Sequence, residues 1–426
     1  MKIKSLPILP VLCVSVLHSV GCQTAASQSA QRQTPSDSIS IPSDFMCGFD
    51  ASTVDFLEEK GAVYRDENGK AQDIFKIVKS HGVNWIRLRM WHDPSKNDEA
   101  GDNSFERTIR TAKRVKDNGL HFLLDFHYSD SWADPGKQKR PSAWDAISTI
   151  DELAGEIGSY TRETLEALKE NGCLPDMVQL GNEINPGFCT MMSDGSPSNI
   201  PISSGENNDE GNKNLVMLLK SACEAVKGVD SHIKRMIHLA SDGSWADLSW
   251  WFERINGFDF EVIGLSYYIF ENHGTISELQ ENIKNLKARY NKEVCVVETS
   301  WAWRFDKVGK DEWKNYVHYE KGVEAAERLS DSENFANISA NISALKELRI
   351  IDQNGKKCVE ASVKNQEVVV RAIIEATATA GGCGVFYWGG DWICDPNGIV
   401  GNNWANQALF NREGKCLSSM SAFRLF

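Results

Sequence analysis

Eight short apolar runs recur along this chain, and each has the length of a buried β-strand. Most are nearly continuous rather than strictly alternating, which is typical of parallel strands that helices cover. We predict strands at Phe45–Ala51, Trp85–Trp91, His121–Tyr128, Met177–Asn185, Arg235–Ser241, Val262–Phe270, Val294–Trp301 and Gly384–Gly390.

Segments with helical periodicity lie between these runs. Several close on a glycine suited to the left-handed position that follows a helix. Ser277 and Gln280 have capping-box spacing before a helix that runs to about Tyr290. The other helices are predicted at Asp73–His81, Ser104–Asn118, Ile150–Asn171, Lys213–Lys227, Asp311–Leu329 and Lys364–Ala380.

Alternating strands and helices imply parallel βαβ units, and eight such units predict an α/β fold, a single (β/α)₈ TIM barrel. No break in composition after residue 44 marks a second domain, so the barrel is expected to occupy residues 44–426. Long connections follow the fourth and seventh strands, at Pro186–Asn212 and Arg304–Cys383. They either form the walls of a substrate groove at the active end of the barrel or are surface insertions without function.

The first 22 residues are typical of a bacterial export signal, because Lys2 and Lys4 precede an apolar core, Leu6–Val16, that is too short to span a bilayer. Small residues come before Cys22, as in a lipoprotein signal, although a serine stands where leucine is usual. Residues 23–43 are polar and form a flexible spacer. We expect a secreted or outer-surface protein with Cys22 as a candidate for lipidation.

The composition narrows the range of partners. The net charge of −13, without a basic stripe, excludes nucleic acid as a partner. Nine of the eleven cysteines lie outside the signal segment, at irregular spacings without a CxxC pair, which argues against zinc and leaves any disulfide pairing open. No heptad repeat or obvious exposed apolar face is present, so a monomer is expected.

Two of the predicted strands lead into a glutamate. MVQLGNEIN contains Glu183, and VCVVETSWAW contains Glu298. Hydrolysis of a glycosidic bond requires two carboxyl groups with unequal roles, one that protonates the leaving oxygen and one that meets the sugar carbon directly or through water. The alternative is that both are strand-end charges that face solvent. Several of the thirteen tryptophans, Trp388 among them, also fall at strand ends, where sugar rings could stack.

The segment FHYSDSWADPGKQKRPSAW, at Phe126–Trp144, resembles the hallmark stretch of glycoside hydrolase family 53, the arabinogalactan endo-β-1,4-galactanases. The blocks GFDAS, VQLGNEINPG, IGLSYY, VVETSWAW and GVFYWGGDWI are similar to other blocks of that family, in the same order. The similarity covers Phe45–Phe423.

This resemblance implies a retaining enzyme in which Glu183 is the acid/base and Glu298 is the nucleophile, with carboxyl groups roughly 5–5.5 Å apart. It also implies that Arg89 helps to keep Glu298 ionised. The other implied substrate-binding residues are Asn182 for the sugar 2-hydroxyl, His127 and Tyr267 or Tyr268 to orient the carboxylates, Trp388 beneath the cleaved sugar, and Asp134, Lys137 and His238 as further substrate contacts.

The chain departs from the family pattern at positions that would bind substrate. Cys189 stands where an aromatic residue is frequent, and Gly389-Gly390-Asp391 stands where an acidic residue and proline are common. Several bacterial members hold calcium in the loop after the seventh strand. Here that loop begins RFDKVGKDEW and lacks their Asp/Gly/His-rich pattern. No cofactor is expected, and calcium stays open as the alternative.

The sequence thus favours an endo-β-1,4-galactanase that acts on the type I arabinogalactan of pectin. A second hypothesis keeps the retaining barrel and changes the substrate to another β-linked polysaccharide, such as mannan or xylan. A third is a surface glycan-binding protein without turnover, which would have no need of both Glu183 and Glu298.

Overall fold

The computed structural model describes residues 41–96, 103–205, 208–240, 243–269, 274–304, 350–353, 356–359, 362–393 and 405–425. All of them belong to one compact unit, Ile39–Phe426. The export signal, Cys22, most of the spacer and the helix predicted at Asp311–Leu329 lie outside the described residues.

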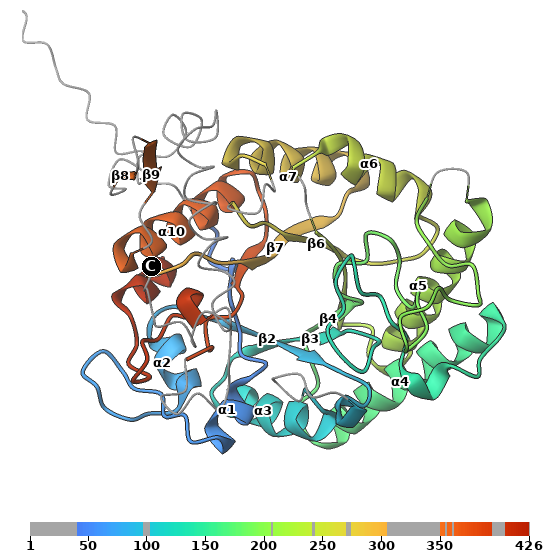
Figure 1. Cartoon of the computed structure of the whole chain (residues 1–426), viewed down its shortest axis with the longest axis horizontal. Helices are drawn as coiled ribbons and strands as arrows, with labels where there is room; N and C mark the ends of the chain where they lie inside the picture. Colours follow the sequence, from blue (N-terminus) through green and yellow to red (C-terminus); the bar gives the residue numbers. More distant parts are fainter. Residues whose placement is uncertain are drawn as a thin grey trace, which may run out of the picture. The chain divides into compact units, whose positions relative to one another are not determined.

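Eight parallel strands form a closed barrel in the order β1-β10-β7-β6-β5-β4-β3-β2, as Figure 1 shows in a view down the ring. All eight strands predicted from the sequence are confirmed. Their bounds are β1 Met46–Asp50, β2 Trp85–Met90, β3 His121–Phe126, β4 Met177–Leu180, β5 Lys234–Ala240, β6 Val262–Ser266, β7 Glu293–Thr299 and β10 Gly384–Tyr387. A separate antiparallel hairpin pairs β8 Ile350–Gln353 with β9 Lys356–Val359.

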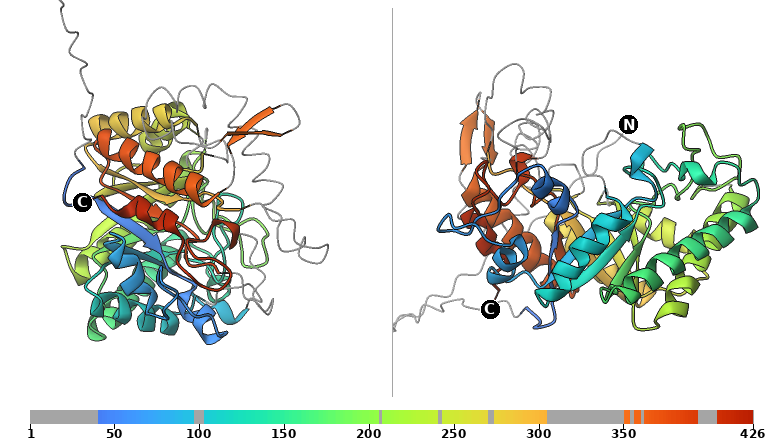
Figure 2. Two further views of the ribbon diagram at one scale, coloured as in Figure 1. Left: turned by 90° about the vertical axis from the view of Figure 1, so that its left-hand side faces the viewer. Right: turned by 90° about the horizontal axis from the view of Figure 1, so that it is seen from below.

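The α-helices lie around the outside of the ring, and α10 contacts both α7 and the C-terminal turn (Figures 1 and 2). Their bounds are α1 Val54–Glu59, α2 Ile74–Ser80, α3 Phe105–Asp117, α4 Ile150–Glu170, α5 Asp209–Val229, α6 Trp245–Arg254, α7 Ile276–Tyr290 and α10 Val363–Thr379. Short 3₁₀ turns occur at Pro94–Lys96, Ser142–Trp144, Ala405–Gln407 and Ser418–Phe423.

Two details of the predicted helices were wrong. The capping box of α7 is made by Thr275 and Glu278, two residues earlier than predicted, because the Glu278 carboxylate accepts from the Thr275 backbone N–H. The helix α5 begins at Asp209, where Asn208 provides the N-cap, and it continues through Gly228. A glycine inside a helix is tolerated when the surrounding turns remain packed.

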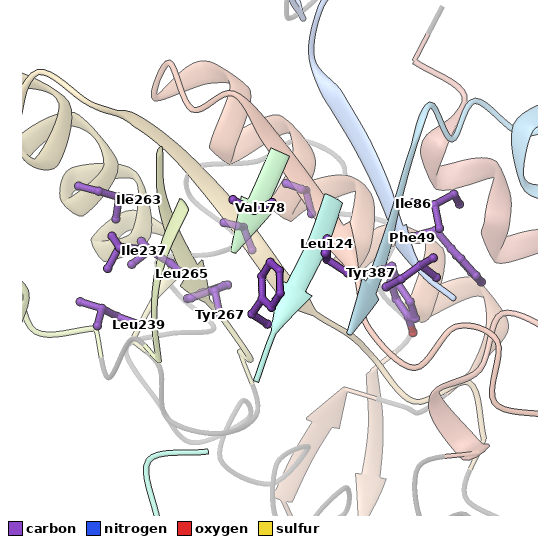
Figure 3. Close-up of a cluster of buried hydrophobic side chains, with 14 of the residues drawn as sticks. Phe49, Ile86, Leu124, Val178, Ile237, Leu239, Ile263, Leu265, Tyr267 and Tyr387 are labelled. Carbon is purple, nitrogen blue, oxygen red and sulfur yellow. The ribbon is translucent and has the colours of Figure 1, made fainter. Parts of the chain in front are cut away.

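The outer face of the strands packs against the helices in the main hydrophobic core. Alternate strand residues such as Ile86, Leu124, Val178 and Ile263 enter this layer, which Figure 3 shows in part. All of them are fully buried. The core therefore fixes the strands from outside and leaves the inner face for other residues.

The inner face of the barrel changes from apolar to polar along the strands. At the lower level lie Met46, Leu123, Met177, Met236, Val262, Cys295, Val297 and Phe386. Nearer the C-terminal strand ends, the buried polar residues are Asp50, Arg87, Asp125, Gln179, His238, Ser266 and Glu298. Because side chains alternate with a period of two, each of Leu123, Met177 and Met236 is followed two residues later by a polar one. The barrel interior therefore has an apolar layer of side chains below a polar layer at the C-terminal ends of the strands.

A β-bulge in β7 aims Glu298 into that layer. Leu265 pairs with Val296, but the next residue, Ser266, pairs with Glu298, so Val297 is an extra residue on β7. The register with β10 shows the same insertion. A bulge bends its strand and re-aims side chains. Val297 fills the apolar inner layer and Glu298, directly after it, still faces Arg87.

Among the described helices, none has both the length and the apolar character needed to cross a membrane.

Candidate active site

Arg87 organises the polar layer inside the barrel. Its side chain has no exposed surface, and each of its five N–H groups meets an acceptor. The acceptors are Gln179 Oε1 at 3.2 Å from Nε, Asp50 Oδ2 at 3.0 Å and Glu298 Oε1 at 2.8 Å from Nη1, and Asp125 Oδ2 at 2.8 Å and Asn182 Oδ1 at 2.9 Å from Nη2. One guanidinium thus fixes side chains from the first, third, fourth and seventh strands.

Glu298 is buried and holds two partners. Arg87 forms an ion pair with Oε1, and the Tyr268 hydroxyl donates to Oε2 over 2.9 Å. Burial raises the pKa of Glu298, whereas the Arg87 charge and the Tyr268 hydroxyl oppose that rise. The carboxylate is therefore held in one orientation and supported in its ionised form.

The expected partner of Glu298 was wrong, because Arg87 rather than Arg89 makes this ion pair. Arg89 instead contacts Asp50 at 3.4 Å, and its guanidinium carbon lies 4.2 Å from the centre of a Trp132 ring. Both arginines point inward from β2 since they are two residues apart. Arg89 lies nearer the C-terminal end of β2 than Arg87 does. Its contact with substrate remains a prediction.

Glu183 lies three residues beyond the end of β4, in a strained turn. Its φ of +47° is unusual for a residue other than glycine, and Gly181 just before it has φ +86°. The buried Gln138 side chain donates to the main-chain oxygens of Asn182, at 2.8 Å, and Glu183, at 3.2 Å. This bond supports the turn and presents the partly exposed Glu183 carboxyl group at the end of the barrel.

The pKa of Glu183 is raised to about 8. Burial is the largest cause, the charge of Glu298 is the next, and Asp134 adds to the rise, whereas a hydrogen bond from Ser266 opposes it. Glu183 therefore holds its proton at neutral pH, as a general acid must.

Ser266 brings the two glutamates together. Its Oγ lies 2.6 Å from Glu183 Oε1, and its backbone is the direct partner of Glu298 in the β6–β7 register. Paired residues on adjacent strands lie about 5 Å apart. The two carboxyl groups, 115 positions apart in the sequence, thus share one small region.

His127 acts on the site through another residue. Its Nδ1 accepts from the Ala133 N–H, at 3.1 Å, and from the Trp91 indole, at 3.2 Å, so Nε2 carries the hydrogen that faces Asp125 at 3.1 Å. Asp125 in turn holds Arg87. His127 was expected to orient the two glutamates, but the carboxylate that it contacts is that of Asp125.

His238 and Tyr267 do not face a substrate. His238 has no exposed surface, and its Nε2 lies 2.8 Å from Ser266 Oγ. This corrects the expectation that His238 contacts substrate. Tyr267 lies in the outer hydrophobic core (Figure 3) and donates to the Gly274 oxygen at 3.1 Å. Tyr268 is therefore the tyrosine that orients Glu298.

Asn182 is oriented by bonds on both ends of its amide. Oδ1 accepts from Arg87, and Nδ2 donates to the Ala133 oxygen at 2.8 Å. That bond uses one of the two Nδ2 hydrogens, and the other remains a donor for the expected sugar hydroxyl.

The aromatic side chain of Trp388 follows β10 and belongs to a cluster with Trp132 and Trp392. Its ring centre lies 4.6 Å from that of Trp392, 6.2 Å from that of Trp132 and 6.4 Å from that of Tyr268. Trp388 is thus held beside Tyr268, the tyrosine that donates to Glu298. Asp134 and Lys137 form a turn through their backbones, with Lys137 exposed and Asp134 near enough to influence the pKa of Glu183.

The sequence reasoning missed several residues of this layer. Asp391 is the most notable, because its Oδ2 accepts from Thr53 and the pKa is raised to about 7 by burial and by Asp50. The missed residues that lie on strands could have been predicted from the alternation of side chains, because they face the same side of the sheet as residues already predicted. The missed residues are Asp50, Arg87, Asp125, Gln138, Gln179, Ser266 and Asp391.

A search of the described residues finds no group of three or more His, Cys, Asp or Glu side chains that could hold a metal ion. The loop from residue 305 on, where the resemblance would place calcium, lies outside them. Seven cysteines in the described part are free thiols.

Comparison with known proteins agrees with this arrangement. The model of glycosyl hydrolase family 53 matches residues 46–351 and 335–423. The arabinogalactan endo-beta-1,4-galactanase of Cellvibrio japonicus is 32% identical, over 90% of this chain and 90% of that protein. The enzyme of the same name from Thermothelomyces thermophilus is 30% identical, over 88% of this chain and 98% of that protein.

Among solved structures, the family 53 glycoside hydrolase catalytic domain of Ignisphaera aggregans aligns with a TM-score of 0.74 and 34% identity, and the alignment covers 90% of this chain and 97% of that chain. The family match spans the barrel and both glutamates. This chain belongs to glycosyl hydrolase family 53.

Proposed function

We propose that this protein is a retaining endo-β-1,4-galactanase that hydrolyses β-1,4-galactan in the type I arabinogalactan of pectin. One observation carries the proposal. Two carboxyl groups meet at the C-terminal ends of the strands in unlike surroundings, Glu183 with a pKa of about 8 and Glu298 against Arg87. The Cellvibrio and Thermothelomyces relatives are named as arabinogalactan endo-β-1,4-galactanases, which supports galactan as the substrate.

In the first step, Glu298 attacks the anomeric carbon while Glu183 gives its proton to the glycosidic oxygen. The bond between that oxygen and the carbon breaks as the Glu298 ester forms. Arg87 and Tyr268 hold the attacking carboxylate in place, and the preorganised contacts need no rearrangement during the reaction.

In the second step, Glu183 is ionised and accepts a proton from water, which attacks the same carbon and displaces Glu298. Two inversions restore the β configuration. The step is efficient at neutral pH because an acid/base with a pKa near the working pH is effective in both roles.

Export and surface attachment are part of the proposal. The charged start, apolar core and Cys22 of the N-terminal segment support secretion with a lipid anchor. Residues 23–43 would act as a flexible spacer between that anchor and the barrel. Lipidation is tested by mass spectrometry of the mature protein. An acylated N-terminal Cys22 is expected, whereas a mature chain that retains residues before Cys22 would contradict this part.

Substrate preference is tested on a panel of linear β-1,4-galactan, mannan and xylan, with released reducing ends as the readout. Galactan should be cleaved best, and Glu183→Gln and Glu298→Gln should each lose almost all activity while keeping the melting temperature within a few degrees. Preferred cleavage of mannan or xylan would replace the substrate, and binding to galactan without released ends would favour a glycan-binding protein.

A further inference from the structure

A buried hydroxyl group stands behind the acid/base. Ser266, at the end of β6, has no exposed surface, and its Oγ lies 2.6 Å from Glu183 Oε1 and 2.8 Å from His238 Nε2. A serine hydroxyl has one hydrogen to donate, so the state of His238 decides where that hydrogen points.

The surroundings of His238 Nδ1 decide which ring nitrogen carries the hydrogen. The main-chain N–H of Glu183 points at Nδ1 from 3.3 Å, and the Gln179 amide nitrogen lies 2.9 Å away. The orientation of that amide is fixed because its oxygen accepts from Arg87 Nε. Both donors favour an Nδ1 that accepts.

One acceptor also lies near Nδ1, and it is already occupied. Asn182 Oδ1 is 2.9 Å from Nδ1, but it already receives Arg87 Nη2 at 2.9 Å. Gln179 Nε2 has two hydrogens, and Asp125 Oδ1 takes one of them at 2.7 Å. The other goes to Nδ1 or to Asn182 Oδ1 at 3.0 Å, and in either case Nδ1 accepts the Glu183 N–H. Burial and the charge of Arg87 lower the pKa of His238 well below its usual range, so the ring is neutral. A neutral ring with an accepting Nδ1 carries its hydrogen on Nε2.

The chain of donors then runs one way. His238 Nε2–H donates to Ser266 Oγ, and the Ser266 hydroxyl donates to Glu183 Oε1. We propose that Ser266, held by His238, is a positioning residue that occupies Oε1 of Glu183 and so directs the catalytic proton to the other carboxyl oxygen, Oε2. This inference rests on the proposed role of Glu183 as acid/base.

The arrangement serves both steps of the reaction. A proton on Oε2 leaves to the glycosidic oxygen as the glycosidic bond breaks and the bond to Glu298 forms. Oε2 later takes a proton from the attacking water as the bond to Glu298 breaks. Between the two steps, the Ser266 hydroxyl stabilises the ionised Glu183 carboxylate, because a donor to a charged acceptor is a strong hydrogen bond. Ser266 thereby opposes the burial that raises the pKa of Glu183.

The test compares Ser266→Ala with the wild-type protein on galactan. The alanine variant should lose about 10- to 100-fold in kcat, with little change in KM, because general acid–base catalysis is impaired and binding is not. The alkaline limb of its pH profile should move to higher pH, since the loss of the donor lets the pKa of Glu183 rise. Ser266→Thr keeps the hydroxyl and should recover most of the activity.

A matched control removes a buried serine hydroxyl elsewhere. Ser419 is buried and donates to Gln366 beside α10, away from both glutamates. Ser419→Ala should lower the melting temperature by a similar amount and leave the pH profile in place. His238→Gln, which changes the donor behind Ser266, should move the alkaline limb in the same direction as Ser266→Ala.

An activated substrate separates the two steps. With dinitrophenyl β-galactobioside the leaving group needs no proton, so Ser266→Ala should form the Glu298 ester at close to the wild-type rate and break it slowly. Azide, which forms a carbon–nitrogen bond without a base, should accelerate turnover of Ser266→Ala severalfold more than that of the wild type and should yield a β-glycosyl azide.

A Ser266→Ala variant that keeps the wild-type alkaline limb and does not respond to azide would overturn the inference, whatever its loss of rate. The wild type decides the proposed function separately. If the wild type does not cleave galactan but cleaves the dinitrophenyl galactobioside, the galactanase assignment fails. The role of Ser266 is then still tested on the dinitrophenyl substrate. If the wild type cleaves neither, both fail.

Discussion

At the scale of single residues, the proposed mechanism depends on the different surroundings of the two glutamates. Glu183 is buried beside the negative charge of Glu298, whereas Glu298 contacts the Arg87 guanidinium and the Tyr268 hydroxyl. The sequence predicted both glutamates as catalytic because each follows an apolar strand, and their catalytic roles stay a prediction. Sequence reasoning named Arg89 where Arg87 belongs, because both lie on the inward face of β2 and the sequence does not give their depth in the barrel.

The raised pKa of Glu183 has a consequence for stability. The folded chain keeps this proton up to a pKa of about 8, whereas the unfolded chain loses it near the ordinary glutamate pKa of 4.5. The free energy of unfolding therefore falls as pH rises through that window. Glu183→Gln should be more stable than the wild type by on the order of 1–3 kcal/mol at pH 8, with little difference at pH 4.

Urea unfolding at both pH values measures this difference. Glu166→Gln, an exposed site on α4, is the control and should show the same stability as the wild type at each pH. A stability gain in Glu183→Gln that is equal at both pH values would contradict the assigned pKa.

Arg87 and Arg89 should respond differently to the same substitution. Arg87→Lys loses most of the four hydrogen bonds and weakens the ion pair with Glu298, and it should reduce kcat/KM by about 100- to 1,000-fold. Its acidic limb should move to higher pH, because weaker support for the carboxylate lets the pKa of Glu298 rise. Arg89→Lys should leave that limb unchanged, since Arg89 contacts Asp50 and Trp132. If only Arg89→Lys shifted the acidic limb of the pH profile, Arg89 would be the residue that keeps Glu298 ionised, as the sequence predicted.

At the scale of elements, the turn after β4 and the bulge in β7 set the directions of the glutamates. Sequence patterns found both strands but extended β4 to Asn185, whereas it ends at Leu180. An apolar run does not reveal a left-handed residue such as Glu183, whose conformation is held by Gln138 from another loop. The bulge at Val297 was hidden for the same reason, because it depends on the register with neighbouring strands.

The turn can be tested through Gly181. A Cβ there would lie 2.5 Å from Ile184 Cγ2, and the positive φ adds about 1–2 kcal/mol of strain. Gly181→Ala should therefore lose stability and also reduce kcat on the order of 10- to 100-fold as Glu183 moves. Gly172→Ala, with φ +70° and no atom within 4 Å, should lose stability alone. Equal kcat losses in the two variants would argue against a positioned turn.

At the scale of the whole molecule, the barrel is closed by β10, and a buried network ties the C-terminal segment to it. The Nε2 of Gln366, on α10, shares its two hydrogens among the oxygens of Trp301 at 2.8 Å, Tyr387 at 2.9 Å and Gln407 at 3.1 Å. The alternation of strands and helices predicted this closure, but the sequence did not reveal the network, since its members lie far apart in the chain.

Gln366→Leu removes a donor that these buried oxygens share with Tyr387 and also removes the acceptor of the buried Ser419 hydroxyl. The free energy of unfolding should fall by about 2–3 kcal/mol, while kcat on galactan changes little at a temperature where the variant is folded. The control is Gln280→Leu on α7, where a single 3.4 Å bond is lost and a change within about 0.5 kcal/mol is expected. A loss in Gln366→Leu no larger than the control would contradict the role of the network.

The central claim is that Glu183 and Glu298 cleave galactan by a double displacement. Proton NMR of the first products from linear β-1,4-galactan tests it most directly, because it reads bond cleavage and anomeric configuration together. The account predicts new reducing ends that appear first as the β anomer and then mutarotate, and that are absent with either Glu→Gln variant. Products that appear first as the α anomer, or an unimpaired variant, would contradict it.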